Sequence, residues 1–201
     1  MEITRLDPAL QLQAAEVTAR AFFNYPMMTS YFPNLARRER HLAWYMGQVQ
    51  VCGLRYGRVY AAPDLAGTAC FLPPEHNRIR FWEYMQNGFA LAPFKWGLKD
   101  YGRVLECEEV VEQAHDEIPK GRPHYYLWWL AVEPAKQGQG IGSALLAPGL
   151  AEADQRRLPV YLETHAEKNV DYYQKRGFTL ARKANVAKYN LPFWCMVKEP
   201  K

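Results

Sequence analysis

The sequence predicts an α/β protein of the α+β kind, in which helices flank a central sheet. Short apolar, β-rich runs alternate with longer stretches whose apolar residues recur every three or four positions, which is typical of strands and amphipathic helices. One apolar run, residues 124–132, leads through a glycine-rich turn into a helical pattern. With 201 residues, 49% of them hydrophobic, the chain is long enough for one well-buried core. We therefore expect a single domain over residues 1–201.

The N-terminal half begins with a strand over residues 3–6. Asp7 and Pro8 then begin a helix, with Asp7 as its N-cap and Pro8 at the first helical position. Residues 24–33 contain two prolines and many aromatic side chains, so we expect a loop packed by its own aromatics.

A second helix is expected over residues 37–54, ending near Gly53. Strands over 58–62 and 67–72 form a hairpin near the middle of the sheet. The pattern from residue 79 to 118 is helical and is interrupted at Pro93 and Gly97, which predicts two helices.

The run from residue 124 to 132 is apolar without alternation, which predicts a central strand buried on both faces. The helix that follows the glycine-rich turn contains Pro148, which removes a backbone N–H and predicts a kink. Three further strands are expected, with a turn at residues 190–192 before the last one. Their ranges are 159–164, 179–183 and 194–198.

The glycine-rich turn predicts an anion site. Glycines at 138, 140 and 142 let the backbone approach a ligand closely, and the helix after them adds unpaired N–H groups and a positive dipole end. The dinucleotide fingerprint is excluded because Ser143 stands where its last glycine belongs, and the chain has no Gly-Lys-Ser/Thr triplet of a nucleoside triphosphate loop.

Two segments carry a resemblance to a known family. Gln137-Gly138-Gln139-Gly140-Ile141-Gly142 matches the pattern Gln/Arg-x-x-Gly-x-Gly/Ala and resembles the coenzyme A pyrophosphate loop of the GNAT family of N-acetyltransferases. Residues 169–178, with Asn169, Tyr172-Tyr173 and Gly177-Phe178, resemble the second signature of that family. Pro148, residues 161–164 and the Trp194…Met196 ending are similar to the puromycin N-acetyltransferase-like branch.

The resemblance implies a GNAT fold, with a mixed, mostly antiparallel sheet that splays at its middle strands. It implies an acetyl-CoA-dependent enzyme that moves an acetyl group to a primary amine by direct attack in a ternary complex. Residues 124–201 would then form the acetyl-CoA-binding half and residues 1–123 the acceptor half. Acyl groups longer than acetyl would need a wider pocket.

The resemblance also assigns site residues. Tyr173 would protonate or hydrogen-bond the coenzyme sulfur, although a shift of one position would give that role to Tyr172. The backbone at Leu130 and Val132 would pair with the pantetheine arm, and an N–H there would polarise the thioester carbonyl, yet both side chains could equally be plain core. The expected coenzyme-binding residues are Leu130, Ala131, Val132, Gln137, Gly138, Gln139, Gly140, Ile141, Gly142, Ser143 and Asn169.

An ammonium acceptor must lose a proton before it can attack, so a general base is needed. Glu163, at the end of its strand, is the first candidate, followed by Glu133 and His165. In the family, the region after the first helix lies beside the acceptor site. The acceptor would be a small-molecule or peptide amine, and the sequence does not decide between an aromatic and a cationic one. A catalytically silent coenzyme A-binding sensor or scaffold with the same fold is the alternative.

Composition argues against other classes. The net charge of +4 is scattered, which disfavours a nucleic acid partner, although Lys136, Lys168, Lys175 and Arg176 could serve a small polyanion. The five histidines and four cysteines form no metal motif or Cys-x-x-Cys pair, so we expect no metal and mostly buried, reduced thiols. No leader pattern or membrane span is apparent, which predicts a cytoplasmic protein without a membrane partner. The aromatic excess leaves room for a homodimer.

Overall fold

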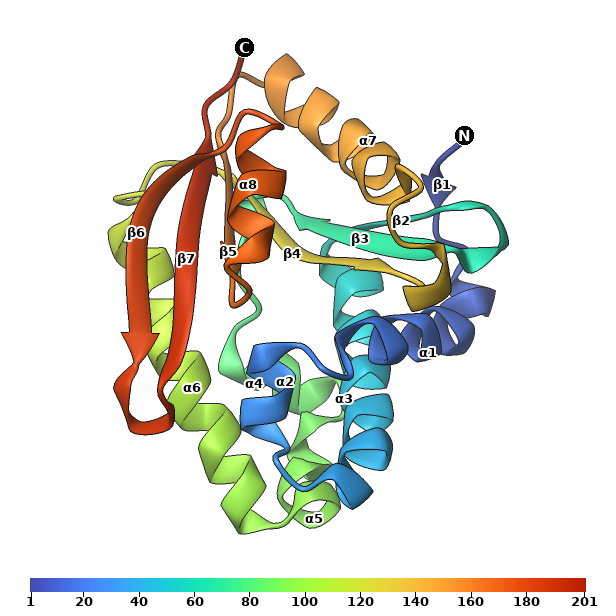
Figure 1. The fold of residues 1–201 in the computed structure, drawn as a ribbon, viewed down its shortest axis with the longest axis vertical. Helices are drawn as coiled ribbons and strands as arrows, with labels where there is room; N and C mark the ends of the chain where they lie inside the picture. Colours follow the sequence, from blue (N-terminus) through green and yellow to red (C-terminus); the bar gives the residue numbers. More distant parts are fainter.

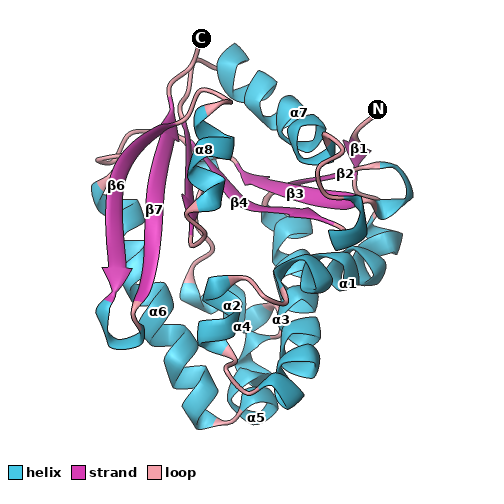
Figure 2. Ribbon diagram, viewed as in Figure 1, coloured by secondary structure: helices cyan, strands magenta, loops and turns pink.

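A seven-stranded sheet runs through the computed structural model, which describes residues 1–201 (Figure 1). The strand order is β1-β2-β3-β4-β5-β7-β6, and every neighbouring pair is antiparallel except β4 and β5, which are parallel. This confirms the predicted mixed, mostly antiparallel sheet flanked by helices (Figure 2). The strands are β1 Thr4–Arg5, β2 Arg58–Ala61, β3 Gly67–Leu72, β4 Tyr125–Val132, β5 Val160–Thr164, β6 Thr179–Val186 and β7 Leu191–Lys198.

Helices cover both faces of the sheet. The helices are α1 Gln11–Phe22, α2 Pro26–Tyr31, α3 Leu35–Tyr56, α4 Phe81–Gln86, α5 Ala92–Trp96, α6 Leu98–Glu117, α7 Ile141–Gln155 and α8 Lys168–Gln174. Helices α1 to α6 pack on one face, and α7 and α8 pack on the other (Figure 1). Asp7 accepts a hydrogen bond from the Ala9 N–H, and Pro8 begins a 3₁₀ turn that leads into α1, so this predicted start is confirmed.

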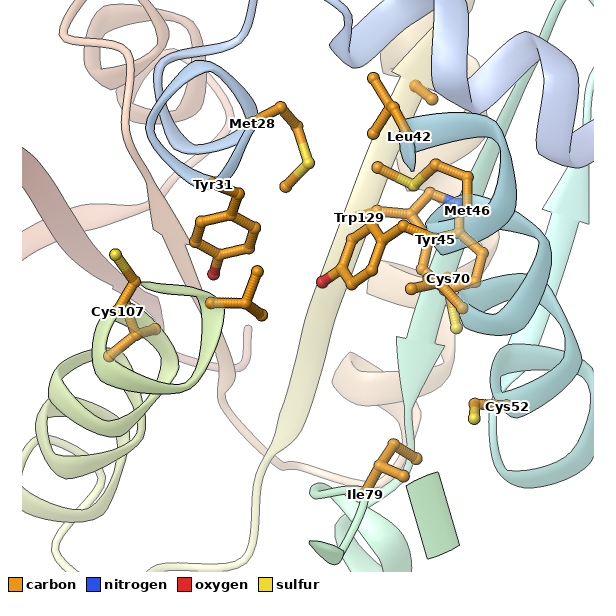
Figure 3. Packing of buried hydrophobic residues seen from close by; sticks show 14 of the residues in the cluster. Met28, Tyr31, Leu42, Tyr45, Met46, Cys52, Cys70, Ile79, Cys107 and Trp129 are labelled. Atoms are coloured by element: carbon orange, nitrogen blue, oxygen red, sulfur yellow. The ribbon is translucent and has the colours of Figure 1, made fainter. Parts of the chain in front are cut away.

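The core is divided by the sheet into two clusters. The larger, with 30 buried residues, lies under α1 to α6, and the smaller, with 18, lies under α7 and α8. Figure 3 shows part of the larger cluster, where Tyr31 of α2 lies beside Cys107 of α6 and Tyr45 of α3 lies beside Trp129 of β4. All four cysteines are buried thiols.

Strands β4 and β5 separate after a very short contact. They pair only at Tyr125–Val160 and Tyr126–Tyr161, although both strands continue beyond these residues. No pair of these strands forms beyond these residues, so the rest of each facing edge has no partner strand. The splay that the family resemblance implied is therefore present, and it opens the centre of the sheet.

A bulge in β4 lies beside this opening. Cys70 of β3 is opposite Trp129 and Phe71 is opposite Leu127, so Trp128 is an extra residue without a partner. The bulge shifts the alternation of side chains along β4. Leu127 therefore packs in the smaller cluster and Trp129 in the larger one.

Several sequence-based expectations were wrong in detail. Strand β4 has buried residues on both faces, as predicted, but half-buried residues alternate with them and face the opening. Residues 24–33 contain a short helix, α2, which starts at Pro26. Residues 79–118 contain three helices, because Pro93 lies at the start of α5 and Gly97, at φ 79°, separates α5 from α6.

The predicted end of α3 was also wrong. The helix continues past Gly53 to Tyr56, and Gly53 packs against the Trp129 indole, which a β-carbon there would approach to 2.3 Å. Strand β7 begins at Leu191, so residues 191 and 192 are in the strand, and the turn depends on Asn190 in the left-handed conformation. Helix α7 runs through Pro148 without interruption, and the kink stays a prediction.

Candidate active site

A cavity of about 580 Å³ crosses the sheet where β4 and β5 separate. It is lined by residues of both predicted halves of the chain. One end is formed by the turn before α7 and by α8, and the other by α1, α2, α3 and α6. The same opening therefore connects the two faces of the sheet.

The glycine-rich turn forms one end of the cavity. Gly138 and Gly140 have φ values of 79° and 82°, a left-handed conformation that disfavours residues with a β-carbon. Nothing lies within 4 Å of a β-carbon built on either residue, so the space in front of the turn is open. Gly140 is the N-cap of α7, whose unpaired N–H groups begin here. The predicted anion cradle thus has both the shape and the polarity that it needs.

Arg176 adds a positive charge beside this cradle. Its guanidinium donates to Ser143 Oγ and lies 3.4 Å above the centre of the Tyr172 ring. Of the four basic residues that the sequence indicated, Arg176 and Lys168 line the cavity, whereas Lys136 and Lys175 do not.

The free edge of β4 forms the middle of the cavity. The Glu133 N–H donates to the Ala66 carbonyl (2.9 Å), so the alternation of an antiparallel ladder turns the N–H and C=O groups of Leu130 and Val132 away from β3. Both residues line the cavity, and the Val132 carbonyl accepts a hydrogen bond from Gln137 (3.3 Å). Ala131 points into the larger core cluster instead, and Gln139 is exposed and does not line the cavity.

The end of β5 is tied to the loop after α1. The Thr164 hydroxyl lies 3.0 Å from the Tyr25 hydroxyl and accepts from the Asn169 side chain (3.0 Å). The His165 N–H donates to the Tyr25 hydroxyl (2.6 Å). Tyr25 thus fixes the N-terminal region against the C-terminal half of the chain, and Asn169 is positioned at the cavity wall.

Tyr172 and Tyr173 both line the cavity but differ in surroundings. The Tyr172 hydroxyl is buried without a hydrogen-bond partner, 2.7 Å from where a β-carbon on Gly142 would lie. The Tyr173 hydroxyl forms no hydrogen bond with the protein, and burial raises its pKa, so it carries its proton at neutral pH. These contacts favour Tyr173 as the residue whose hydroxyl is available to a ligand.

Glu163 lies on the cavity wall on the side of α3 and α6. Its Oε1 accepts from the Tyr126 hydroxyl, and its Oε2 is buried without any partner. Burial is the main cause that raises the pKa of Glu163 to about 8. A carboxyl of this kind can accept a proton near neutral pH.

Glu108 of α6 is a second cavity carboxyl that the sequence analysis missed. It accepts hydrogen bonds from the hydroxyls of Tyr31 (2.6 Å) and Tyr45 (3.4 Å). Burial raises the pKa of Glu108 to about 7. One signal was available, because Glu108 lies between Val104 and Val111 on the apolar stripe of its helix, where an acidic residue is unexpected.

The other two candidates for the base are differently placed. Glu133 pairs with Arg20 at 2.8 Å and does not line the cavity. His165 lines the cavity and is 3% exposed; burial lowers its pKa to about 4 and its Nε2 has no partner. Glu163 is therefore the best-placed of the three.

Comparison with known proteins agrees with this geometry. A sequence model of the Acetyltransferase (GNAT) family matches residues 21–178. The chain belongs to the GNAT acetyltransferase family.

Relatives of this GNAT protein cover its full length. An uncharacterized N-acetyltransferase of Schizosaccharomyces pombe is 24% identical over 209 residues, covering 100% of this chain and 84% of the relative. The crystal structure described as histone acetyltransferase HPA2 and related acetyltransferase, from Corynebacterium glutamicum, has a TM-score of 0.69 at 20% identity and covers 99% of this chain and 96% of that one. Mosquito arylalkylamine N-acetyltransferase like 5b has a TM-score of 0.66 at 15% identity and covers 98% and 99%.

The GNAT chain has no helix that is both long and apolar enough to cross a membrane. It also has no group of three or more His, Cys, Asp or Glu side chains placed to hold a metal ion.

Replacement of Gly140 by alanine should weaken coenzyme A binding about tenfold. The left-handed conformation costs a residue with a β-carbon about 1–2 kcal/mol, and the turn would relieve this strain by rotating its N–H groups out of the cradle. Calorimetric titration with coenzyme A measures the change. Gly102→Ala is the matched control, because Gly102 lies in α6 with open space around it. Unchanged affinity of the Gly140 variant would argue against the cradle.

Stability should fall between pH 6.5 and pH 9. The folded pKa values of Glu108 and Glu163, about 7 and 8, exceed the ordinary value of 4.5, so the folded state holds protons that the unfolded chain releases. This contribution to stability is fully present below pH 4.5 and is lost as the pH rises through the folded pKa values of the two carboxyls. The pKa values of His41, His115, His124 and His165 are lowered from 6.5, so these groups partly oppose the fall up to about pH 7.5, where the unfolded histidines have lost their protons, and do not change stability above it.

Thermal unfolding across this pH range tests the expectation. The midpoint should fall by about 3 °C or more in the wild type and by less in Glu108→Gln, because one buried carboxyl no longer loses its proton. Glu109→Gln, on the exposed side of the same helix, should behave as the wild type. A pH dependence that is identical in all three proteins would contradict the assignment.

Proposed function

We propose that this protein is an acetyl-CoA-dependent N-acetyltransferase that acetylates a primary amine by direct attack in a ternary complex. One observation supports this above all. A single cavity joins an anion cradle on one face of the sheet to two half-buried carboxyls on the other, and it passes the unpaired backbone edge of β4 on the way.

The coenzyme fits the first part of this cavity. Its diphosphate would lie on the N–H groups at Gly138, Gly140 and the start of α7, and its pantetheine arm along Leu130 and Val132. Acetyl-CoA supplies the acetyl group as a thioester. The lining residues that would hold it are Gln137, Gly138, Gly140, Ile141, Gly142, Ser143 and Asn169, with Leu130 and Val132.

The protein's own groups supply the remaining chemistry. Glu163 takes the proton that the ammonium must lose, and an N–H of the β4 edge stabilises the negative charge that develops on the carbonyl oxygen. The nitrogen forms a bond to the carbonyl carbon as the carbon–sulfur bond breaks. The second proton that the nitrogen then loses passes to the departing thiolate, to which Tyr173 donates a hydrogen bond. No acyl-enzyme is needed, because proximity in one cavity brings both substrates together.

The finer assignments belong to the same proposal. We place the chain in the puromycin N-acetyltransferase-like branch on the residues of its C-terminal segments, and in the cytoplasm, where buried thiols stay reduced. The name of the mosquito neighbour specifies an arylalkylamine, and an amine acceptor suits the acidic end of this cavity as well.

Glu163→Gln should lower kcat about 100-fold with little change in the KM for acetyl-CoA. The variant keeps the shape of the side chain but cannot accept the proton, and general bases contribute about 100- to 10,000-fold. In the wild type, kcat/KM should rise with pH to a plateau above about pH 8, because Glu163 must be deprotonated and its pKa is about 8. Thiol release over a panel of amines gives both measurements.

Glu109→Gln is the control for this experiment, since it removes an exposed carboxyl. Normal turnover by Glu163→Gln would reject Glu163 as the base. Saturable acetyl-CoA binding without turnover on any amine would instead favour the sensor or scaffold alternative.

Tyr173→Phe should lower kcat about tenfold, whereas Tyr172→Phe should change it little. The first loses the hydrogen bond to the sulfur, worth about 1.4 kcal/mol in the transition state. The second removes a hydroxyl that is buried without a partner. Turnover with one saturating amine distinguishes the two, and the reverse order of effects would assign the role to Tyr172.

A further inference from the structure

Two acidic side chains from different elements share the acceptor end of the cavity. Glu163 comes from β5 and Glu108 from α6, and both line the cavity. Burial and, to a lesser extent, the negative charge of Glu108 raise the pKa of Glu163. No salt bridge joins either carboxyl to a basic side chain of the protein, although each accepts hydrogen bonds from tyrosine.

No protein cation balances these two carboxyls. One lysine and one arginine line the cavity, Lys168 and Arg176, and neither forms a salt bridge with these carboxyls. Lys168 is exposed to solvent, and Arg176 is held by Ser143 and the Tyr172 carbonyl at the coenzyme end. A buried charge without a partner is costly, so an occupant that brings positive charge is favoured here.

Several hydrogen-bond acceptors at this end of the cavity also have no donor from the protein. Glu163 Oε2 and His165 Nε2 are buried without partners, and His165 is 3% exposed. Both tyrosine hydroxyls that reach Glu108 donate to its Oε1, so Oε2 remains available to a ligand. An ammonium group offers three N–H donors and suits such a set of acceptors.

The proposed reaction uses only one of the carboxyls as a base. Once Glu163 has taken the proton, the attacking nitrogen is neutral and the amide product carries no charge at that position. Glu108 would then be left as a buried negative charge. A second cationic nitrogen on the acceptor, which does not react, would balance Glu108 throughout the reaction.

We propose that the acceptor is a diamine, in which one primary amine is acetylated next to Glu163 and a second ammonium is bound by Glu108. This inference rests on the proposed function and assigns its substrate class. Tyr31 and Tyr45 are positioning residues, because their hydroxyls fix the Glu108 carboxyl. Aromatic and aliphatic side chains of this region, Tyr45, Val111, Tyr126 and Trp128, offer an apolar wall for the methylene chain between the two nitrogens.

Matched pairs of amines test the proposal. The rate of thiol release is measured with 1,4-diaminobutane against n-butylamine and with 1,5-diaminopentane against n-pentylamine. For the wild type, kcat/KM should be at least tenfold higher for the diamine of at least one pair. Glu108→Gln should remove this preference, mainly through a higher KM for the diamine, while Glu109→Gln should keep it. A wild type without any preference would overturn the proposal and leave the proposed function intact.

Binding is measured separately, so that turnover is not needed. Calorimetric titration of each amine into wild type and Glu108→Gln, both saturated with coenzyme A, should show at least tenfold weaker diamine binding by the variant. If no amine is acetylated but diamine binding still depends on Glu108, the result supports a diamine ligand and contradicts the proposed acetyltransferase activity. Equal binding of diamine and monoamine by the wild type would overturn the inference even if Glu108→Gln fails to fold.

Discussion

The separation of β4 from β5 is the constraint on which the rest of the site depends. Two residue pairs hold the strands together at one end, and beyond Tyr126 and Tyr161 the sheet is open. An unpaired strand edge inside a protein is costly unless something satisfies its N–H and C=O groups. Here the edge at Leu130 and Val132 faces a cavity, so a ligand can supply the missing hydrogen bonds. The separation of the two strands thus leaves an edge of β4 along which an extended ligand can bind.

The opening also explains how one cavity can have an end that suits an anion and an end that suits a cation. The smaller core cluster, with α7 and α8, carries the glycine turn and Arg176, which suit an anion. The larger cluster, with α3 and α6, carries Glu108, which suits a cation. The bulge at Trp128 lets one strand present side chains to both environments within a few residues. Opposite charges therefore stay on opposite faces of the sheet, and in the proposed reaction the two substrates would meet only at the gap.

The sequence predicted those parts that depend on local geometry. Gly138 and Gly140 are informative because a left-handed turn before a helix is a property of a few consecutive residues, and the structure places both as expected. Glu108 lies 55 positions before Glu163 in the chain, and only the packing of α6 against the sheet brings them to one cavity. The end of α3 was misjudged for the same reason, because Gly53 serves the contact with Trp129 and does not terminate the helix. Long-range packing accounts for both errors. The apolar stripe of α6 marks Glu108 as unusual, but no local pattern shows that it shares a cavity with Glu163 or that Gly53 contacts Trp129.

The tyrosines around the two carboxyls show how an acidic pair can remain in a largely apolar region. Burial favours the protonated form of Glu108 and Glu163, whereas a hydroxyl that donates to a carboxylate favours the charged form. The two effects leave both pKa values near neutrality. A carboxyl with a pKa near neutrality can accept a proton from one nitrogen, or form an ion pair with a second nitrogen, at little cost in free energy. In the proposed reaction these two acids, whose partial burial costs stability, would accept a proton and bind a cation in one site.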